Sequence, residues 1–402
     1  MSLRPALQIV HVSDLHFRDT RSGDAKLLND RWAVFERAIR RSVKKYDAFD
    51  WYEGTQGHYP LGPEAFSAYL TGKLVPEAPE WFQGDERPPT WLIDTGDLTA
   101  FGDQAAIDLG RSWLGRWCDE LGGAKLRSLA GNHDAWAGCH PAFSLTSSPD
   151  FTAAQARLRS LPEWDRDAWL SQPLRAPLPG NSAHIELYAV DSICWDPVPN
   201  LFAMGHVDAR SLAALAAQIE ARQAKGLNLR ILAIHHPVAY PWLAHEVVTA
   251  KAIPSMRLLN SDEVAERLNN DQCVPDVGPL AHMILSGHTH GAWPSDDFPP
   301  TVFDIRQDRL GDYQIQLVGG PLILNKAHVR ARIQDARILK SEAFSNLSVD
   351  RNLFKAQVLR FYFEPVRPWE VVMYRIPVYS ANGSIYRQGA PSRTILYMTA
   401  PV

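Results

Sequence analysis

The chain has 402 residues, of which 46% are hydrophobic and 21% are charged, and its formal net charge is −4. This composition is ordinary for a globular protein with a sizeable core and argues against a disordered chain. The slightly acidic balance disfavours a general nucleic-acid binder, which would carry a basic excess, but it leaves a local basic groove open.

The N-terminal segment runs directly into a predicted strand at residues 7–12 and lacks the apolar region and cleavage site of a signal peptide. No run of about 18 apolar residues predicts a membrane-spanning helix. The four cysteines lie far apart and form no C-x-x-C pair, so we expect free thiols in a reducing compartment. They are Cys118, Cys139, Cys194 and Cys273. These features predict a cytoplasmic protein without a membrane partner.

Short apolar runs bounded by turn residues predict strands that are covered on both faces. They lie at residues 7–12, 91–93, 126–130, 185–190, 229–234 and 282–285. Helix-like stretches separate them, and the clearest covers residues 208–224, with Asp208 as the predicted N-cap. Strands that alternate with helices predict a layered α/β fold.

Two long segments interrupt this alternation, at residues 46–90 and 140–182. A structureless loop of this length is uncommon unless it has a function or a local structure of its own. Packed surface excursions are the simpler interpretation. A lid or pocket wall is the alternative.

The last part of the chain carries β-branched and aromatic residues in alternating patterns, at residues 354–363, 371–378 and 394–398. These patterns predict antiparallel strands. No clear linker precedes them. We therefore predict a single domain over residues 1–402, with its core at 7–320 and with residues 321–402 supplying strands that complete or extend the sheet.

Five short motifs carry the residues of chemical interest, and each follows a predicted strand. In chain order they are Asp14-Leu15-His16, Gly96-Asp97, Gly131-Asn132-His133-Asp134, His235-His236-Pro237 and Gly287-His288-Thr289-His290. Ligands of open α/β sheets bind at the carboxyl ends of strands, so we expect the motifs to converge on one site. The glycines let the backbone turn sharply at a strand end, because they lack a Cβ.

The side chains of these motifs are carboxylates, imidazoles and an amide, which together form a borderline-hard set of metal ligands. This set suits manganese, iron or zinc better than calcium or copper(I). Each motif is weak by itself, because short D-x-H, G-D and H-H-P sequences also occur in turns and caps. All five in order, each after a strand, are far more specific.

This combination resembles the calcineurin-like metallophosphoesterase superfamily over residues 7–320, and the H-H-P and G-N-H-D motifs are most similar to those of class III cyclic nucleotide phosphodiesterases. The resemblance implies an α/β fold, a two-sheet β-sandwich flanked by helices. It also implies hydrolysis of a phosphate ester by two divalent metals, with a cyclic nucleotide-like or other small phosphodiester as the expected substrate.

The resemblance also implies roles for individual residues. Ligands of a first metal would be Asp14, His16 and His290, and ligands of a second metal would be Asn132, His235 and His288. Asp97 would bridge both metals. His133 would lie near the leaving group as a candidate general acid or transition-state stabiliser.

The implied chemistry follows from the two metals. Metals about 3.5–4 Å apart clamp the attacking and leaving oxygens of an in-line displacement, and a bridging hydroxide is the expected nucleophile. Two dications, two carboxylates and one hydroxide leave a charge of about +1, which attracts an anionic ester. A small-molecule phosphate ester is the expected partner, and the oligomeric state is left open.

One departure separates the chain from the protein serine/threonine phosphatases of this superfamily. Ala100 stands where they have the Asp that orients the catalytic histidine, Phe101 replaces a phosphate-binding Arg, and Asp134 replaces Glu. A protein phosphatase is therefore disfavoured, and the group that orients His133 is left open. The remaining histidines are interpreted as structural or surface residues: His11, His58, His140, His184, His206, His236, His245, His282 and His328.

Two other functions remain as alternatives. A nuclease of the same superfamily is one, and the acidic balance of the chain counts against it. A non-catalytic protein-binding scaffold is the other, and the complete set of seven predicted ligands with His133 counts against that.

Overall fold

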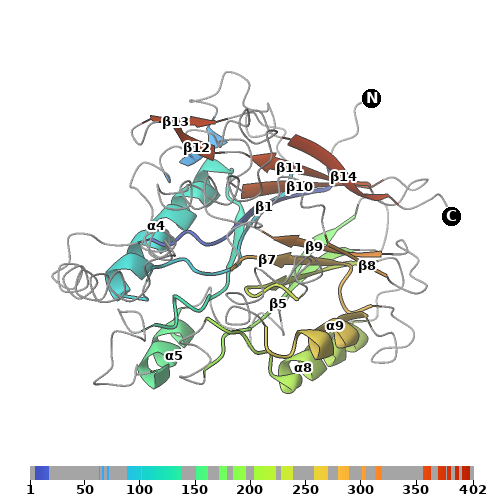
Figure 1. The fold of residues 1–402 in the computed structure, drawn as a ribbon. Helices are drawn as coiled ribbons and strands as arrows, with labels where there is room; N and C mark the ends of the chain where they lie inside the picture. Colours follow the sequence, from blue (N-terminus) through green and yellow to red (C-terminus); the bar gives the residue numbers. More distant parts are fainter. Residues whose placement is uncertain are drawn as a thin grey trace, which may run out of the picture.

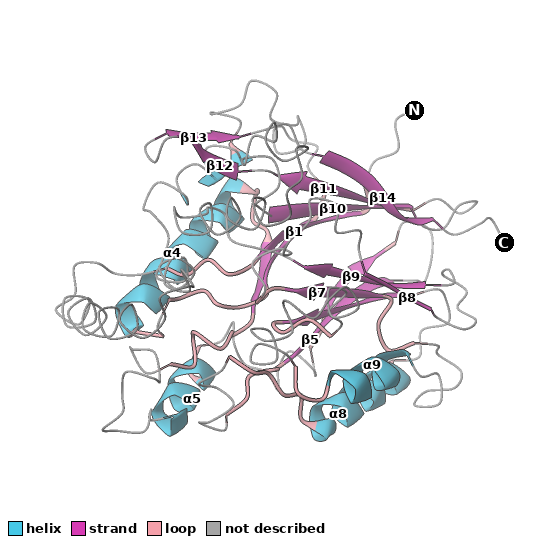
Figure 2. Ribbon diagram, viewed as in Figure 1, coloured by secondary structure: helices cyan, strands magenta, loops and turns pink. Residues whose placement is uncertain are grey.

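A computed structural model describes residues 5–17, 63, 66–67, 70–71, 88–100, 102–136, 151–161, 172–178, 184–195, 203–222, 228–238, 258–269, 279–288, 301–304, 313–318, 356–363, 370–376, 378–381, 385–388 and 392–398. The strands in these segments form two six-stranded sheets and one small hairpin. Figure 1 shows the two sheets stacked one above the other. Figure 2 shows the helices placed around them.

The first sheet has the order β14-β11-β10-β1-β2-β3. Its parallel half consists of β1 (Leu7–Val12), β2 (Thr90–Asp94) and β3 (Lys125–Ser128). Its antiparallel half consists of β10 (Ala356–Tyr362), β11 (Glu370–Ile376) and β14 (Ser392–Met398). Because β10 pairs with β1 in antiparallel register, the end of the chain extends the sheet that the beginning starts.

The second sheet has the order β4-β5-β6-β7-β9-β8. Its centre is parallel and consists of β5 (His184–Val190), β6 (Leu229–Ile234), β7 (Met283–Ser286) and β9 (Tyr313–Val318). Its antiparallel edges are β4 (Leu174–Pro177) and β8 (Thr301–Asp304). The separate hairpin pairs β12 (Val378–Ala381) with β13 (Ile385–Gln388).

Helices cover the sheets from two directions. The described helices are α4 (Gln104–Glu120), α5 (Phe151–Arg159), α8 (Ala209–Ala221) and α9 (Ser261–Asn269). α4 contacts β2 and β3, whereas α8 and α9 lie beneath the second sheet, on the side away from the first sheet (Figure 1). The Asp208 side chain accepts a hydrogen bond from the Arg210 backbone N–H, which confirms the predicted N-cap of α8.

The alternation of side chains along β6 explains why the second sheet is covered on both faces. Ile231 and Ala233 belong to the main core, which also contains residues of the first sheet, such as Ile9. Leu232 and Ile234 belong to a second core, which contains Leu212, Leu215 and Ile219 of α8. Successive residues of a strand point to opposite faces, so a continuous apolar run fills both cores.

The architecture that the resemblance implied is confirmed: two mixed sheets with flanking helices. All six predicted apolar strands occur, although β3 ends at Ser128, before the predicted end at residue 130. The C-terminal strands are antiparallel, as predicted. The prediction of a single domain stays a prediction.

Several predictions fall partly outside the described residues. Most of the excursions at 46–90 and 140–182 does so, although α5 and β4 lie within the second. Cys118 and Cys194 are buried free thiols, as expected, whereas Cys139 and Cys273 are not described. In the described part of the chain, no helix has the length and apolar character needed to cross a membrane.

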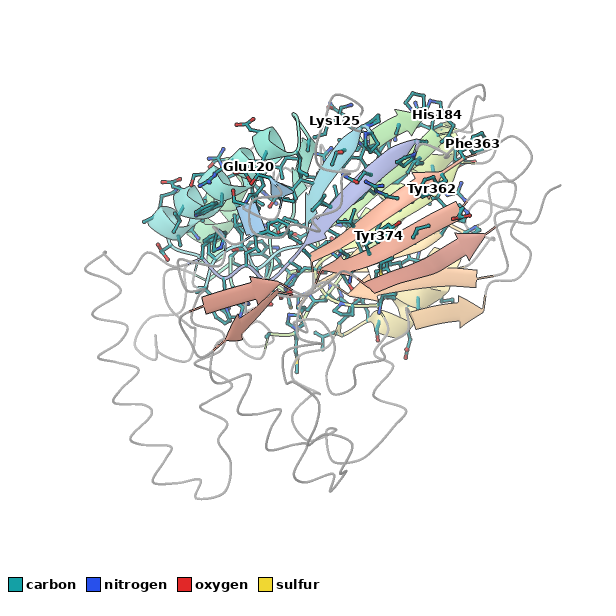
Figure 3. All side chains as sticks on the ribbon, turned by 90° about the horizontal axis from the view of Figure 1, so that it is seen from above. Glu120, Lys125, His184, Tyr362, Phe363 and Tyr374 are labelled. Carbon is teal, nitrogen blue, oxygen red and sulfur yellow. The ribbon has the colours of Figure 1, made fainter. Side chains whose placement is uncertain are left out.

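The parallel strands of both sheets run in the same general direction. Lys125 and His184, the first residues of β3 and β5, lie on the same side of the molecule in Figure 3. Sheets that pack face to face keep their strands within about 30° of one another. The carboxyl ends of both sets of parallel strands therefore meet at one edge.

Candidate metal centre

Loops at the carboxyl ends of five parallel strands bring the sequence motifs together. In the first sheet, the backbone N–H of Asp14 donates to the carbonyl of Gly96, and that of His16 donates to the carbonyl of Asp97, both at 2.9 Å. In the second sheet, the N–H of Gly287 donates to the carbonyl of His235 at 3.0 Å. These bonds hold the loops of each sheet side by side beyond the strands.

The backbone at this edge is strained at the motif residues. Asp14, His16, Asp97 and His288 have φ angles of 54°, 47°, 55° and 67°. Non-glycine residues rarely adopt this left-handed region, and where they do they cluster at functional sites. Among the described non-glycine residues, only Ala203 shares this conformation.

The glycines of the motifs have two different uses. Gly96 has a φ of 104°, so it makes the sharp turn that we predicted. Gly131 and Gly287 instead leave room for close approach. A Cβ on Gly131 would lie 2.1 Å from Oδ1 of Asp97, and one on Gly287 would lie 1.8 Å from Oγ of Ser13.

Asp97 lies at the centre of the site and is almost fully buried. Its Oδ1 accepts a hydrogen bond from the backbone N–H of His133 at 2.9 Å and lies 3.5 Å from Nε2 of His235. Its Oδ2 lies 3.9 Å from Nε2 of His133 and 4.0 Å from Nε2 of His16. Three imidazoles therefore turn a ring nitrogen towards one carboxylate.

The side chain of His235, which follows a strand of the second sheet, contacts residues that follow strands of the first sheet. Its Nδ1 lies 2.8 Å from the carbonyl oxygen of Thr95, which can only accept, so Nδ1 carries the proton. In the neutral ring, Nε2 then holds a lone pair. That nitrogen faces Oδ1 of Asn132 at 3.1 Å and Oδ1 of Asp97 at 3.5 Å. Three atoms with lone pairs thus point at one another.

His133 is oriented in the same manner. Its Nδ1 donates to the carbonyl oxygen of Ala100 at 2.8 Å, which leaves Nε2 directed towards Asp97. A backbone carbonyl of Ala100 therefore does what an Asp side chain at that position does in the protein phosphatases. The sequence could not show this, because every residue has a carbonyl.

Asp134 fastens the loop of Asp97 to the loop of His133. Its carboxylate accepts hydrogen bonds from the backbone N–H groups of Leu98, Thr99 and Gly131 and from the hydroxyl of Thr99, at 2.7–3.1 Å. A carboxylate that accepts several such bonds is well satisfied although it is fully buried. Asp134 therefore has a structural role, because its hydrogen bonds link the two loops.

Burial and neighbouring charges set the electrostatics of the site. Burial, helped by the nearby Asp97 carboxylate, raises the pKa of Asp14. Burial alone would also raise the pKa of Asp97, but the imidazoles of His235, His133 and His16 hold it well below its ordinary value. Burial would lower the pKa of His235, but Asp97 and Asp14 raise it to about 9. At neutral pH these shifts leave a proton on Asp14 and a second one on His235, and a divalent cation bound among the same side chains would take the place of those protons.

Three overlapping groups of side chains have the spacing of metal ligands, with ligand atoms within 4.8 Å of one another. They are Asp14, Asp97 and His235; His16, Asp97 and His133; and His235, His236 and His288. Two groups share Asp97 and two share His235. The site can therefore hold more than one cation around a common carboxylate.

Comparison with known proteins identifies the family. The family model described as calcineurin-like phosphoesterase matches residues 7–292, which is more than half of the chain. The chain belongs to the calcineurin-like phosphoesterases. The predicted resemblance to this family is thus confirmed, and membership implies metal-dependent hydrolysis of a phosphate ester.

Two solved structures are similar to this calcineurin-like phosphoesterase. Phosphopantetheinyl hydrolase (PptH) from Mycobacterium tuberculosis has 11% identity and a TM-score of 0.36, over 85% of this chain and 95% of that one. Sulfate thiohydrolase SoxB from Thermus thermophilus has 11% identity and a TM-score of 0.31, over 99% of this chain and 57% of that one. Scores this low support no conclusion about the substrate. No curated protein matches the sequence.

The donor set fits the metals that a calcineurin-like phosphoesterase requires. Nε2 of His235, Oδ1 of Asn132 and Oδ1 of Asp97 converge although none of them has a proton to share in the neutral-imidazole state. Such a cluster is unfavourable in a dry interior unless a cation or an extra proton lies among its members. Imidazole, amide oxygen and carboxylate are ligands for borderline-hard divalent metals.

The structure brings seven of the eight predicted site residues to this edge: Asp14, His16, Asp97, Asn132, His133, His235 and His288. All seven are buried. His290, the eighth, lies outside the described residues. Their assignment as ligands of particular metals stays a prediction.

His236 lies closer to the site than a purely structural interpretation predicts. Its ring centroid is 4.2 Å from that of His288 and 4.9 Å from that of His235. Its Nδ1 lies 2.9 Å from Oγ of Ser192, just beyond the end of β5. Ser192 was missed, although the strand-end rule that found the five motifs also applies to β5.

Proposed function

We propose that the protein is a phosphodiesterase that binds two divalent metals, with manganese, iron or zinc as the native ions. The substrate is a small phosphodiester, similar to a cyclic nucleotide. The convergence of Asp97, Asn132 and His235 at 3.1–3.5 Å is the observation that carries the proposal.

Each proposed ligand set draws on both sheets. The first metal would be held by Asp14, His16 and His290, and the second by Asn132, His235 and His288. Asp97 would contact both, because its two carboxylate oxygens already face different imidazoles. Thr95 supports the second set, since its carbonyl fixes the tautomer of His235 and leaves Nε2 for the metal.

Two divalent metals, when bound, polarise the phosphoryl oxygens and lower the pKa of water so that it attacks phosphorus at neutral pH. The chain contributes positioning around this chemistry. His133 donates its Nδ1 proton to the carbonyl of Ala100 and presents Nε2 beside Asp97. In the imidazolium form, Nε2 carries a second proton, and there it is placed to donate a hydrogen bond to a phosphoryl oxygen or to transfer that proton to the leaving group.

The proposal of a diester substrate rests on two sequence differences from the protein phosphatases. Ala100 replaces the Asp, and Phe101 the phosphate-binding Arg, of the protein phosphatases. Without that Arg, the site has less positive charge for the dianion of a monoester. A diester carries one negative charge and needs less compensation.

The test uses purified protein, Mn²⁺ and bis-p-nitrophenyl phosphate. We expect turnover by the native chain and a fall to the background rate in Asp97→Asn, because the amide removes one negative charge from the shared carboxylate. Metal content by elemental analysis should fall in the same variant. Asp108→Asn is the matched control, since Asp108 is exposed on α4 and should leave turnover and metal content unchanged.

Full activity in Asp97→Asn would contradict the assignment of the shared carboxylate. A substrate panel then identifies the ester, with cyclic nucleotides, mononucleotides, glycerophosphodiesters and single-stranded DNA. Preference for mononucleotides would overturn the diester proposal. Preference for DNA, with strong salt dependence, would instead favour a nuclease.

A further inference from the structure

The ring of His133 is held by a partner that mutation cannot remove directly. Nδ1 of His133 donates to the backbone carbonyl of Ala100 at 2.8 Å. The orientation of a carboxylate partner is set by its own side-chain torsions. The orientation of a carbonyl is set only by the peptide plane to which it belongs. Whatever fixes the backbone at Ala100 therefore fixes the direction of Nε2 of His133.

Trp136 contacts both members of this hydrogen bond. Its ring centroid lies 3.9 Å from that of His133, with 40° between the ring planes. Trp136 and Ala100 also form a small hydrophobic cluster that is separate from the two larger cores in the described part of the chain. Trp136 therefore packs on the ring and on the residue that supplies its carbonyl partner.

Backbone contacts leave this arrangement little freedom. The N–H of Trp136 donates to the carbonyl of His133 at 3.2 Å. A Cβ on Gly102 would lie 2.1 Å from the carbonyl oxygen of Trp136, so the loop of Ala100 rests directly on the Trp136 backbone. Thr99, one residue before Ala100, is tied to Asp134 by two hydrogen bonds of 2.7 and 2.8 Å.

A second imidazole also packs against His133. The ring of His16 meets that of His133 edge-on, with 4.6 Å between the centroids and 76° between the planes. Without Trp136, the His133 ring would have space to rotate about its side-chain bonds. Rotation would break the bond to Ala100 and turn Nε2 away from Asp97.

We propose that Trp136 is a positioning residue for His133: its indole packs on the imidazole and on Ala100 and so fixes the direction of Nε2. This inference rests on the proposed function, in which His133 acts on the substrate. Trp136 itself is 2% exposed, and its part in the reaction is exerted through His133.

The experiment is a double-mutant cycle between Trp136 and His133. Trp136→Leu should lower kcat about 10- to 100-fold, because small misplacements of a reacting group cost up to about 100-fold. KM should change less than about threefold, and metal content should not change. Trp136→Phe keeps an aromatic face and should restore most of the turnover.

The decisive comparison is made in a His133→Ala background. If Trp136 acts through His133, adding Trp136→Leu should change kcat by less than about twofold, since coupled residues are not additive. Trp113→Leu is the matched control, because Trp113 lies on α4 and stacks on Arg116, and it should leave kcat unchanged. Trp136→Met replaces the leucine variant if the latter does not fold.

Histidine NMR with ¹⁵N labelling gives a readout that does not depend on turnover. A fixed Nδ1–H tautomer of His133 is expected in the native chain and in Trp136→Phe, and an averaged signal in Trp136→Leu. Equal losses of kcat in the presence and absence of His133, or an unchanged tautomer in Trp136→Leu, would overturn the inference. Absence of any esterase activity in the native chain would instead overturn the proposed function, and the NMR result would still stand.

Discussion

Steric limits, as well as hydrogen bonds, determine which residue types this site can accept. Gly131 shows this most directly, because the position of its missing Cβ is taken by the Asp97 carboxylate and by the backbone nitrogen of Asp97. A backbone atom cannot rotate away as a side chain can. The loop of Asp97 therefore approaches the loop of Asn132 more closely than any other residue type at position 131 would allow.

Gly131→Ala tests this close approach. The added Cβ would lie 2.1 Å from Oδ1 and 2.3 Å from the backbone nitrogen of Asp97, so the two loops must separate. We expect turnover to fall about 100-fold, as for other misplacements near 1 Å, with weaker metal binding. Enzyme assays and elemental analysis measure both effects.

The control is Gly115→Ala on α4, where an added Cβ meets nothing within 4 Å. This variant should keep full turnover and gain roughly 0.5–1 kcal/mol of stability, because alanine is the better helix former. Native turnover in Gly131→Ala would show that the loops can move apart without harm.

Elements of the first sheet carry polar groups that the core must satisfy. His11 of β1 is fully buried, and its Nε2 lies 3.0 Å from Oγ1 of Thr95. This agrees with the interpretation of His11 as a structural residue. Burial, only partly offset by the nearby Gln357 side chain, lowers its pKa from 6.5 to about 4.

This shift predicts a pH dependence of stability. Between pH 7 and about pH 4, the unfolded chain binds a proton at His11 and the folded chain does not, so stability falls as the pH falls. The loss from pH 7 to pH 5 should be about 2 kcal/mol. His11→Gln removes the titrating group, so the loss of stability between pH 7 and pH 5 should be smaller by that amount.

Urea denaturation at the two pH values, for the native and His11→Gln chains, measures the difference. Only the change with pH is compared, so a constant loss of stability in the variant does not matter. Identical slopes in the two proteins would show that His11 takes up its proton equally well in the folded state.

At the scale of the whole molecule, strands from the two ends of the chain pair in the first sheet. β10 lies between β1 and β11, and its residues Val358, Leu359 and Phe361 are buried. β1 in turn leads to Asp14 and His16. The C-terminal strands therefore support the site although they contribute none of the proposed ligands.

Shortened chains test this dependence. A chain of residues 1–355 lacks β10, so one edge of β1 has no paired strand. We expect no cooperative thermal transition by near-UV circular dichroism. A chain of residues 1–391 loses only the edge strand β14 and keeps the pairing of β10 with β1. It should fold with reduced stability. A cooperative transition in the shorter chain would mean that residues 356–402 form a separate unit.

Local sequence patterns were sufficient to predict the strands of both sheets and the residue types of the site. Strands β1, β5 and β6 could be predicted because strands covered on both faces have a continuous hydrophobic sequence. The convergence of the motifs could be predicted because residues at the carboxyl ends of strands form the ligand sites of α/β sheets. The cap of α8 was readable because Asp208 supplies its own acceptor.

The partners that orient those residues could be identified only in the folded chain. Thr95 fixes His235 across the two sheets, Ala100 fixes His133, and Ser192 meets His236 from the end of β5. The first two partners act through backbone carbonyls, which every residue possesses, so no residue type signals them. Their positions depend on how two sheets pack at one edge, and that packing is a property of the folded chain rather than of any local sequence pattern.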